Sequence, residues 1–384
     1  MVESRKILFF TGMVLVVCGV FVACNIYTLI PIYQHVSESL NVTAEQVVFG
    51  STLFTLFYSF GLLTFGALSD AFGRRKIIIF GLLTSAVTTL LVGLSSTIEI
   101  LYTFRAIQGF SLAAFAPVTF TYCFETFPAK YRTLVISLIN TGFLVAGILG
   151  QVISQAFADF SNWRDTYHFF AISYAVLFLM TFISLPKIKE ACNRGKLMET
   201  YKRIIQNKSL LKCYGIVFTL LFSFIAFYDG LNHVYEDHPN QLFTLRMIGL
   251  LGAILSFFTG KILDRWGDMK TLYLGLVLGN TSLLFLIFDA SFYVLAIVSV
   301  MLVSAISILV PTMITIIGAI AGKDRAKALS IYSFILLTGA TAASPIAILL
   351  SFKITVLLLI FLFLGNFLLG SSLFPKAKRQ SAQL

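Results

Sequence analysis

Long, continuously apolar stretches separated by short polar segments dominate the chain, and they predict helices that cross a membrane. Stretches such as 7–33, 47–68 and 133–157 carry apolar side chains at consecutive positions, not at alternating ones. A helix needs about 20 apolar residues to cross the hydrocarbon core of a bilayer, whereas a strand of a membrane barrel alternates. Because a helix satisfies its own backbone hydrogen bonds in lipid, the pattern predicts an all-α membrane protein.

The pattern contains twelve such stretches, which predict twelve transmembrane helices. A short basic stretch precedes the first one and no small-residue cleavage site follows it, so we expect this span to be retained and not removed as a signal peptide. The expected spans are 7–33, 47–68, 77–95, 99–125, 133–157, 167–185, 210–232, 243–262, 271–288, 291–317, 328–350 and 354–373.

Composition supports this interpretation and excludes other classes of protein. Hydrophobic residues make up 58% of the 384 residues and charged residues only 12%, whereas soluble domains carry about 25% charged residues. The five cysteines and four histidines show no metal-ligand spacing, and the sequence contains no Walker loop or dinucleotide fingerprint. We therefore expect no disulfide, metal or cofactor, and no transport driven by ATP.

The basic residues predict the orientation of the chain in the membrane. If the N-terminus lies inside, the cytoplasmic segments hold 24 of the 28 Lys and Arg residues, and the outer loops hold only Arg164 and Lys353. This distribution follows the positive-inside rule and predicts a multi-pass protein of the cell inner (plasma) membrane with both termini in the cytoplasm. It also explains the net charge of +11, because these cations face anionic headgroups. Since they are dispersed over many short loops, no nucleic-acid partner is expected.

The two halves of the chain repeat each other at an offset of 194 residues. The longest polar segment, 186–209, separates the halves and is the expected cytoplasmic linker. Landmarks matched at this offset predict two homologous six-helix bundles, at 1–185 and 210–384. The matched pairs are Gly66 and Gly260, Asp70 and Asp264, Gly73 and Gly267, and Pro117 and Pro311.

Two motifs give the chain a family resemblance. The stretch GALSDAFGRRK at 66–76 resembles the signature loop between helices two and three of the major facilitator superfamily, and GKILDRWGDMK at 260–270 resembles its weaker counterpart, with Asp268 and Met269 in place of basic residues. The stretch from Arg105 through Gln108 and Gly109 is similar to a motif of the family's proton-coupled drug exporters, although the span-five stretch AGILG lacks their usual Gly-Pro. The resemblance implies twelve helices in two pseudo-symmetric six-helix bundles. It also implies a monomer whose partners are a small-molecule substrate, protons and the lipid bilayer.

The signature loop predicts a conformational latch at the cytoplasmic face. Glycine permits close helix approach at 66 and a tight turn at 73. We expect Asp70 to accept hydrogen bonds from a helix N-terminus in the other half, and Arg74 or Arg75 to pair with Glu125. A purely topogenic role accounts for Lys76 and Lys270 but not for Asp70 or the glycines. The predicted latch residues are Gly66, Asp70, Gly73, Arg74, Arg75, Glu125, Arg132 and Asp264.

Polar side chains inside the spans predict the path of substrate and protons, because such groups are rare and costly in a membrane. Two repeated bundles imply a site near the midplane at their interface. Sixteen of the seventeen acidic residues fall in loops or at membrane faces, and Asp229, the one that we place within a span, is the candidate proton carrier. The alternatives remain that Asp229 stays ionised among headgroups, that Arg246 is interfacial and that Arg105 is structural. The candidates are Asn25, Tyr58, Arg105, Gln108, Asn140, Asp229, Asn232 and Arg246.

These observations favour secondary active export of small organic or amphipathic compounds by alternating access, driven by proton entry as in multidrug antiport. The alternative is a facilitator or proton-coupled carrier of a sugar or an anionic metabolite, which the intramembrane arginines suit. A polytopic membrane enzyme needs a convergent acid, histidine or metal cluster in the membrane, and the sequence shows none. We therefore expect a transporter and not an enzyme.

Overall fold

Helices form all of the regular structure in the residues that the computed structural model describes, which are 2–187, 197–235, 239–288 and 290–373. No strand occurs among them. The helices gather into two compact units. The first comprises Met1–Leu197 with Leu329–Ser333, and the second comprises Met198–Ala328 with Phe334–Leu384. The all-α class expected from the apolar pattern is confirmed.

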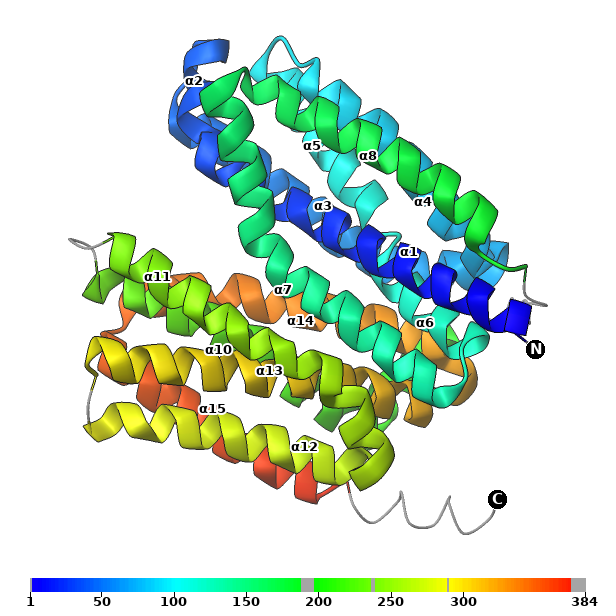
Figure 1. Cartoon of the computed structure of the whole chain (residues 1–384), viewed down its shortest axis with the longest axis vertical. Coiled ribbons are helices and arrows are strands. Elements are labelled where there is room, and N and C mark those ends of the chain that lie inside the picture. The colour runs from blue at the N-terminus through cyan, green and yellow to red at the C-terminus, as the bar shows by residue number, and fades with distance from the viewer. Residues whose placement is uncertain (1, 188–196, 236–238, 289, 374–384) are drawn as a thin grey trace. The chain divides into compact units, whose positions relative to one another are not determined.

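The first unit is built from pairs of long helices that pack side by side (Figure 1). Its elements are α1 (Val2–Tyr27), η1 (Ile30–Ile32), α2 (Tyr33–Leu40), α3 (Ala44–Phe72), α4 (Arg74–Gly93), α5 (Ile98–Leu112), α6 (Ala116–Thr126), α7 (Ala129–Phe160) and α8 (Trp163–Ser184). Helix α1 packs against α7 and α8, α3 packs against α5, and α4 packs against α8. Six segments are long and apolar enough to cross a membrane: Ile7–Leu40, Ala44–Phe72, Arg74–Gly93, Ile98–Thr126, Ala129–Phe160 and Trp163–Ser184.

In the second unit, α12 and α10 each pack against both α13 and α15. The described elements of this half are α9 (Leu197–Gln206), α10 (Lys208–Val234), α11 (Pro239–Gly249), η2 (Leu250–Leu255), α12 (Ser256–Phe288), α13 (Phe292–Ala321), η3 (Gly322–Asp324), α14 (Arg325–Leu349) and α15 (Phe352–Ser371). Its candidate membrane segments are Lys208–Leu231, Gln241–Phe288, Phe292–Ala347 and Phe352–Ser371.

Two of these four segments have the length of two membrane crossings each. They contain 48 and 56 residues, and 48 helical residues extend about 70 Å, which exceeds twice the ~30 Å hydrocarbon core. A glycine with positive φ interrupts each segment, Gly267 at 77° in the first and Gly322 at 51° in the second. Within the described part of the chain, the segments are therefore consistent with six crossings per unit and with the twelve predicted spans.

Three predicted spans are interrupted where the apolar pattern predicts single helices. The span at 7–33 contains most of α1 and all of η1 and ends where α2 begins, and the span at 99–125 breaks between α5 and α6. The span at 243–262 passes from α11 through η2 into α12. Pro31 and Pro117 occupy the first turns of η1 and α6, where the missing N–H of proline breaks no helical hydrogen bond. Pro311, the repeat counterpart of Pro117, instead lies inside continuous α13. Matched prolines therefore do not produce matched breaks.

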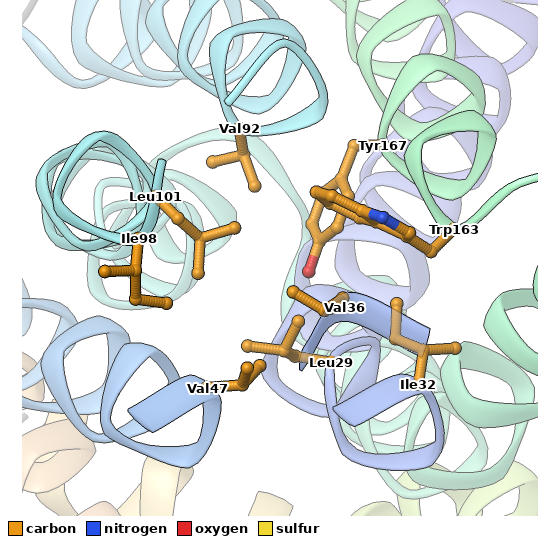
Figure 2. Packing of buried hydrophobic residues seen from close by; sticks show 9 residues of the cluster. All are labelled: Leu29, Ile32, Val36, Val47, Val92, Ile98, Leu101, Trp163 and Tyr167. Carbon is orange, nitrogen blue, oxygen red and sulfur yellow. The ribbon is translucent and has the colours of Figure 1, made fainter. Parts of the chain in front are cut away.

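A buried apolar core holds the α2, α3, α4, α5 and α8 ends of the first unit together (Figure 2). The ring of Trp163 stands edge-on to that of Tyr167, with centroids 6.0 Å apart. The core residues are Leu29, Ile32, Val36, Val47, Val92, Ile98, Leu101, Trp163 and Tyr167. Because Tyr167 also lies beside Arg105, with its ring centroid 6.0 Å from the guanidinium carbon, this core borders the polar cluster described below.

Candidate functional site

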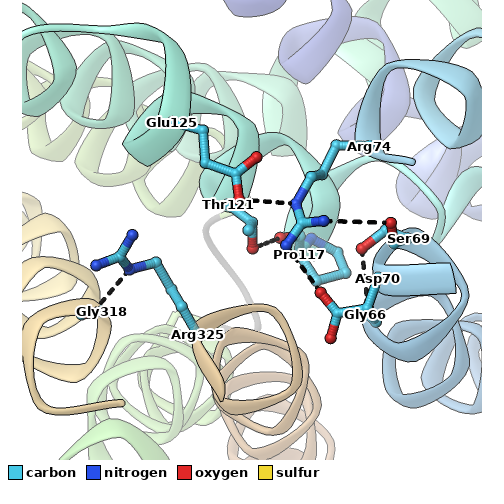
Figure 3. Close-up of polar contacts among 9 residues, drawn as sticks. All are labelled: Gly66, Ser69, Asp70, Arg74, Pro117, Thr121, Glu125, Gly318 and Arg325. Carbon is cyan, nitrogen blue, oxygen red and sulfur yellow. Dashed lines mark hydrogen bonds and ion pairs between the residues drawn. The ribbon is translucent and has the colours of Figure 1, made fainter. Parts of the chain in front are cut away.

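An ion-pair triad of two buried residues, Asp70 and Arg74, and the more exposed Glu125 joins α3, α4 and α6 in the first unit (Figure 3). Arg74 Nη2 lies 2.8 Å from Asp70 Oδ1, and Arg74 Nε lies 3.0 Å from Glu125 Oε1. The side chains of Arg74 and Asp70 are only 8% and 4% exposed. Charges attract one another more strongly where water is excluded, so the pair of Arg74 with Asp70 is stronger than a surface pair. Of the two arginines expected to pair with Glu125, Arg74 is confirmed as a partner.

The turn at Gly73 creates this geometry. Helix α3 ends at Phe72, α4 begins at Arg74, and Gly73 between them has a φ of 98° that glycine adopts without steric cost. The tight turn expected at Gly73 is therefore confirmed. Gly66 is buried on α3, where its carbonyl accepts a hydrogen bond from the Ser69 hydroxyl at 2.8 Å. The close helix approach expected at Gly66 stays a prediction.

Arg75, at the start of α4, forms hydrogen bonds with the end of α8. Its Nε donates to the Leu185 carbonyl at 2.7 Å, and its Nη2 donates to the Phe182 carbonyl at 2.6 Å. The last carbonyls of a helix lack intrahelical partners and carry partial negative charge, so a guanidinium stabilises them. Arg132, expected near Glu125, lies over the Phe124 ring with its guanidinium carbon 4.4 Å from the centroid.

The second copy of the signature loop does not form such a triad. Asp264 is exposed on α12, and no hydrogen bond or ion pair joins it to another described residue. At the 194-residue offset, Asp268 stands in place of Arg74 and Ala319 in place of Glu125. The copy therefore lacks both the cation and the second carboxylate, although Gly267 keeps its positive φ. Asp264 is therefore placed differently from Asp70, and its part in a conformational latch stays a prediction.

A second polar cluster lies inside the first unit and joins α1, α4, α5 and α8. Arg105 Nη1 donates to Gln108 Oε1 at 2.7 Å. Gln108 Nε2 donates to Asn25 Oδ1 at 2.9 Å and to Thr89 Oγ1 at 2.8 Å. Asn25 Nδ2 donates to the Tyr174 hydroxyl at 2.5 Å. All five side chains are fully buried, and we call these residues the Arg105 cluster.

Neutral and aromatic groups surround the charge of Arg105. Its guanidinium carbon lies 4.2 Å from the centroid of the Phe54 ring, a geometry in which the ring face attracts a cation. Tyr58, a predicted path residue, is buried and stacks on Phe54 with centroids 5.9 Å apart. Nε and Nη2 of Arg105 have no hydrogen-bond partner among the described residues. The cluster therefore offers a desolvated cation with two unused donors.

The structure brings Asn25, Arg105 and Gln108 together, as members of one cluster. Thr89 and Tyr174 could not be predicted from the sequence, because a threonine or tyrosine in an apolar helix is usually a packing residue. No feature of the sequence distinguishes Thr89 and Tyr174 from the other threonines and tyrosines of the apolar helices.

The remaining path candidates do not join this cluster. The amide of Asn140 donates to the Ile136 carbonyl of its own helix at 2.8 Å. Asp229 is half-buried near the end of α10, and Arg246 is half-buried in the last turn of α11. Arg246 acts electrostatically on Tyr228, the residue before Asp229. The side chain of Asn232 lies outside the described residues, so the roles of these residues stay predictions.

The residues that the structure describes contain no group of three or more His, Cys, Asp or Glu side chains placed to hold a metal ion. The cysteines that it describes, Cys18, Cys24, Cys123 and Cys213, are buried free thiols.

Comparison with known proteins identifies the family. The sequence profile of the Major Facilitator Superfamily matches residues 15–279 and 232–384. The chain is 23% identical over 271 residues to an uncharacterized MFS-type transporter, YybF, of Bacillus subtilis (68% of this chain, 67% of the relative). It is 25% identical over 275 residues to a bicyclomycin resistance protein homolog of Haemophilus influenzae (68% of each chain).

A solved structure shares the fold. The crystal structure of the MFS transporter FucP in the outward conformation superimposes with a TM-score of 0.77 at 14% identity, covering 95% of this chain and 98% of that one. The curated relatives are matched over about two thirds of their own length, whereas the family profile extends over most of this chain. The protein is therefore a multi-pass membrane transporter, not an enzyme, and it belongs to the major facilitator superfamily.

Proposed function

We propose that this transporter exports small organic compounds by alternating access and that proton entry drives the export. Three observations support the proposal. One relative is named a bicyclomycin resistance protein homolog, the stretch from Arg105 to Gly109 resembles a motif of proton-coupled exporters, and no nucleotide-binding motif occurs in the sequence. The Arg105 cluster is the structural observation that carries the proposal.

A charged residue inside a membrane bundle is costly to bury, and such residues typically belong to substrate or proton pathways. Arg105 is fully buried, and its cluster links four helices through one continuous set of hydrogen bonds. A group that binds the two unused donors of Arg105 lies beside the bond from Arg105 to Gln108, and a shift of the guanidinium alters the contacts of all four helices. This is the kind of coupling that alternating access requires.

We propose Asp229 as the residue that carries the coupled proton. It is half-buried on α10, in the same region as Tyr228 and Arg246. Acidic residues inside membrane segments are rare and typically belong to proton relays. Asp229→Asn then abolishes the dependence of transport on the pH gradient, although the protein still inserts.

A carrier of anionic metabolites is the second candidate function. The two unused donors of Arg105 favour it, because a buried guanidinium binds an anionic group strongly. In this alternative, cells that express the protein accumulate or lose a carboxylate without gaining resistance to toxic compounds.

Growth in the presence of toxic compounds, bicyclomycin among them, tests export. Cells that express the protein should tolerate higher concentrations than cells with an empty vector, and a proton uncoupler should remove the difference. Arg105→Ala should remove it as well at equal membrane expression, whereas Arg265→Ala, at an exposed position of α12, should not. Protection that survives the uncoupler contradicts proton-driven export.

We further propose an inner-membrane location with both termini cytoplasmic, on the 24-to-2 distribution of basic residues. Lys202 lies exposed on α9, in the segment between the predicted halves. In a background without the native cysteines, a membrane-impermeant thiol reagent should label Lys202→Cys only after the cells are permeabilised. Labelling of intact cells contradicts this orientation.

A further inference from the structure

One edge of the Arg105 guanidinium, which we call the open edge, has no hydrogen-bond partner among the described residues of the first unit. Nε and Nη2 lie on the same edge of the planar group, and their N–H bonds point in the same direction. Both nitrogen atoms are buried, and no described residue accepts a hydrogen bond from either. The third nitrogen, Nη1, donates to Gln108 Oε1 at 2.7 Å. The two N–H groups with which an arginine binds a bidentate acceptor are therefore the unused part of the Arg105 side chain.

No counter-charge for Arg105 appears within the described chain. The ion pairs found there join Arg74, His168 and Arg203 to carboxylates, and none includes Arg105. Its contacts are the Gln108 amide oxygen and the ring faces of Phe54 and Tyr167. Ring faces attract a cation but do not replace two hydrogen bonds in the plane of the guanidinium. A buried charge in this condition is unstable unless an anion joins it.

We propose that the open edge of Arg105 binds a small anionic group that accepts both N–H bonds. A carboxylate does so with two oxygens in the bidentate geometry that guanidinium groups favour, and a halide does so with one atom. If the anionic group is a carboxylate, it belongs to the transported compound, and this assignment rests on the proposed export function. If the anionic group is a halide, it is a free ion, and its binding does not depend on that function.

If the anion is the carboxylate of a transported compound, the aromatic side chains around Arg105 favour a compound with an apolar body. Phe54 and Tyr167 flank the guanidinium, and both are buried. An aromatic carboxylate places its ring among these side chains while its charge meets Arg105. Benzoate is therefore the probe of choice, and benzamide, which has the same shape without the charge, is its neutral match.

The test measures the thermal unfolding midpoint of the purified full chain in detergent micelles, with benzoate, benzamide or sodium chloride added. A ligand that binds only the folded state raises the midpoint in proportion to its concentration relative to Kd. Benzoate should raise the midpoint and benzamide should not. A rise with benzoate alone assigns the site to the substrate carboxylate, whereas a rise with chloride as well assigns it to small anions in general.

Variants separate this site from other effects of salt. Arg105→Gln should weaken anion binding by about tenfold or more, and Arg265→Gln, on the exposed surface of α12, should leave it unchanged. If Arg105→Gln does not fold, Arg105→Lys retains the charge without the bidentate edge and should still lose most of the benzoate effect. The proposal is overturned if neither anion stabilises the wild-type chain, or if the foldable Arg105 variant responds as the wild type does. Either result leaves the cell-based export assay intact as a separate test.

Discussion

The Arg74 guanidinium stands 2.8 Å from the Asp70 carboxylate, one helical turn away across the turn at Gly73. The same guanidinium reaches Glu125 on α6 at 3.0 Å. One cation therefore holds three helices of the first unit, and the Asp70 carboxylate is nearly excluded from water. Breaking a buried pair by removing one partner strands the other charge, which is why single substitutions here have large effects.

Asp70→Asn should lower both stability and transport. The amide keeps the shape of the side chain but loses the negative charge, so we expect a loss of about 1–3 kcal/mol in the free energy of unfolding. Transport at equal expression should fall strongly, because the triad no longer closes. Asp264→Asn is the matched control, since Asp264 occupies the repeat position and is exposed. Equal behaviour of the two variants contradicts the role assigned to the triad.

Arg75→Ala should destabilise the chain less than Asp70→Asn. The substitution removes two hydrogen bonds to the carbonyls of Leu185 and Phe182, but Arg75 is half-exposed and water replaces part of the loss. We expect about 1 kcal/mol. Thermal unfolding of Arg75→Ala beside Lys76→Ala checks this, because Lys76 is exposed and should tolerate alanine.

Gly109→Ala should destabilise the contact between α3 and α5. A Cβ at this position meets the Phe54 carbonyl oxygen at 2.2 Å, so the helices must separate. Overpacking of this kind costs about 1–3 kcal/mol. Gly365→Ala is the control, since no atom lies within 4 Å of its added Cβ, and alanine in a helix is favoured by about 0.5–1 kcal/mol. The unfolding midpoint should fall for the first variant and stay level or rise for the second.

The ion pair between Arg203 and Asp324 should hold α9 to the turn between α13 and α14. Arg203 Nε and Nη2 lie 2.9 and 3.0 Å from the two carboxylate oxygens. Arg203 is 66% exposed, so a double-mutant cycle with alanine should give a coupling of only about 0.5–1 kcal/mol. Hydrogen exchange of the α9 amides should speed up in both single variants, and high salt should reduce the difference.

The sequence predicts much of the fold because membrane helices follow from local properties of the chain. Apolar length, the placement of basic residues and the repeat of Gly73 at Gly267 are each readable without tertiary structure. The interruption of the fourth span depends instead on how Pro117 is accommodated, since Pro311 at the matching position leaves its helix intact. Local composition does not distinguish these two outcomes.

The candidate sites were predictable only in part. The pairing of Arg74 with Glu125 follows from charges at one membrane face, where few partners compete. The Arg105 cluster depends on four helices meeting at one point, and that meeting is set by packing across spans up to 149 residues apart. Asn25 and Arg105 could therefore be predicted as separate candidates, but their connection through Gln108 could not.

Proton movement in proteoliposomes tests the central claim, that a proton gradient drives export. The purified protein is reconstituted in vesicles that enclose the pH indicator pyranine, a pH gradient is imposed, and a compound that the protein exports from cells is added. The compound should speed the decay of the gradient through the wild-type protein, and Asp229→Asn should abolish this acceleration at equal protein content. Transport of the compound at the same rate with and without the gradient, and with no proton movement, would contradict the account.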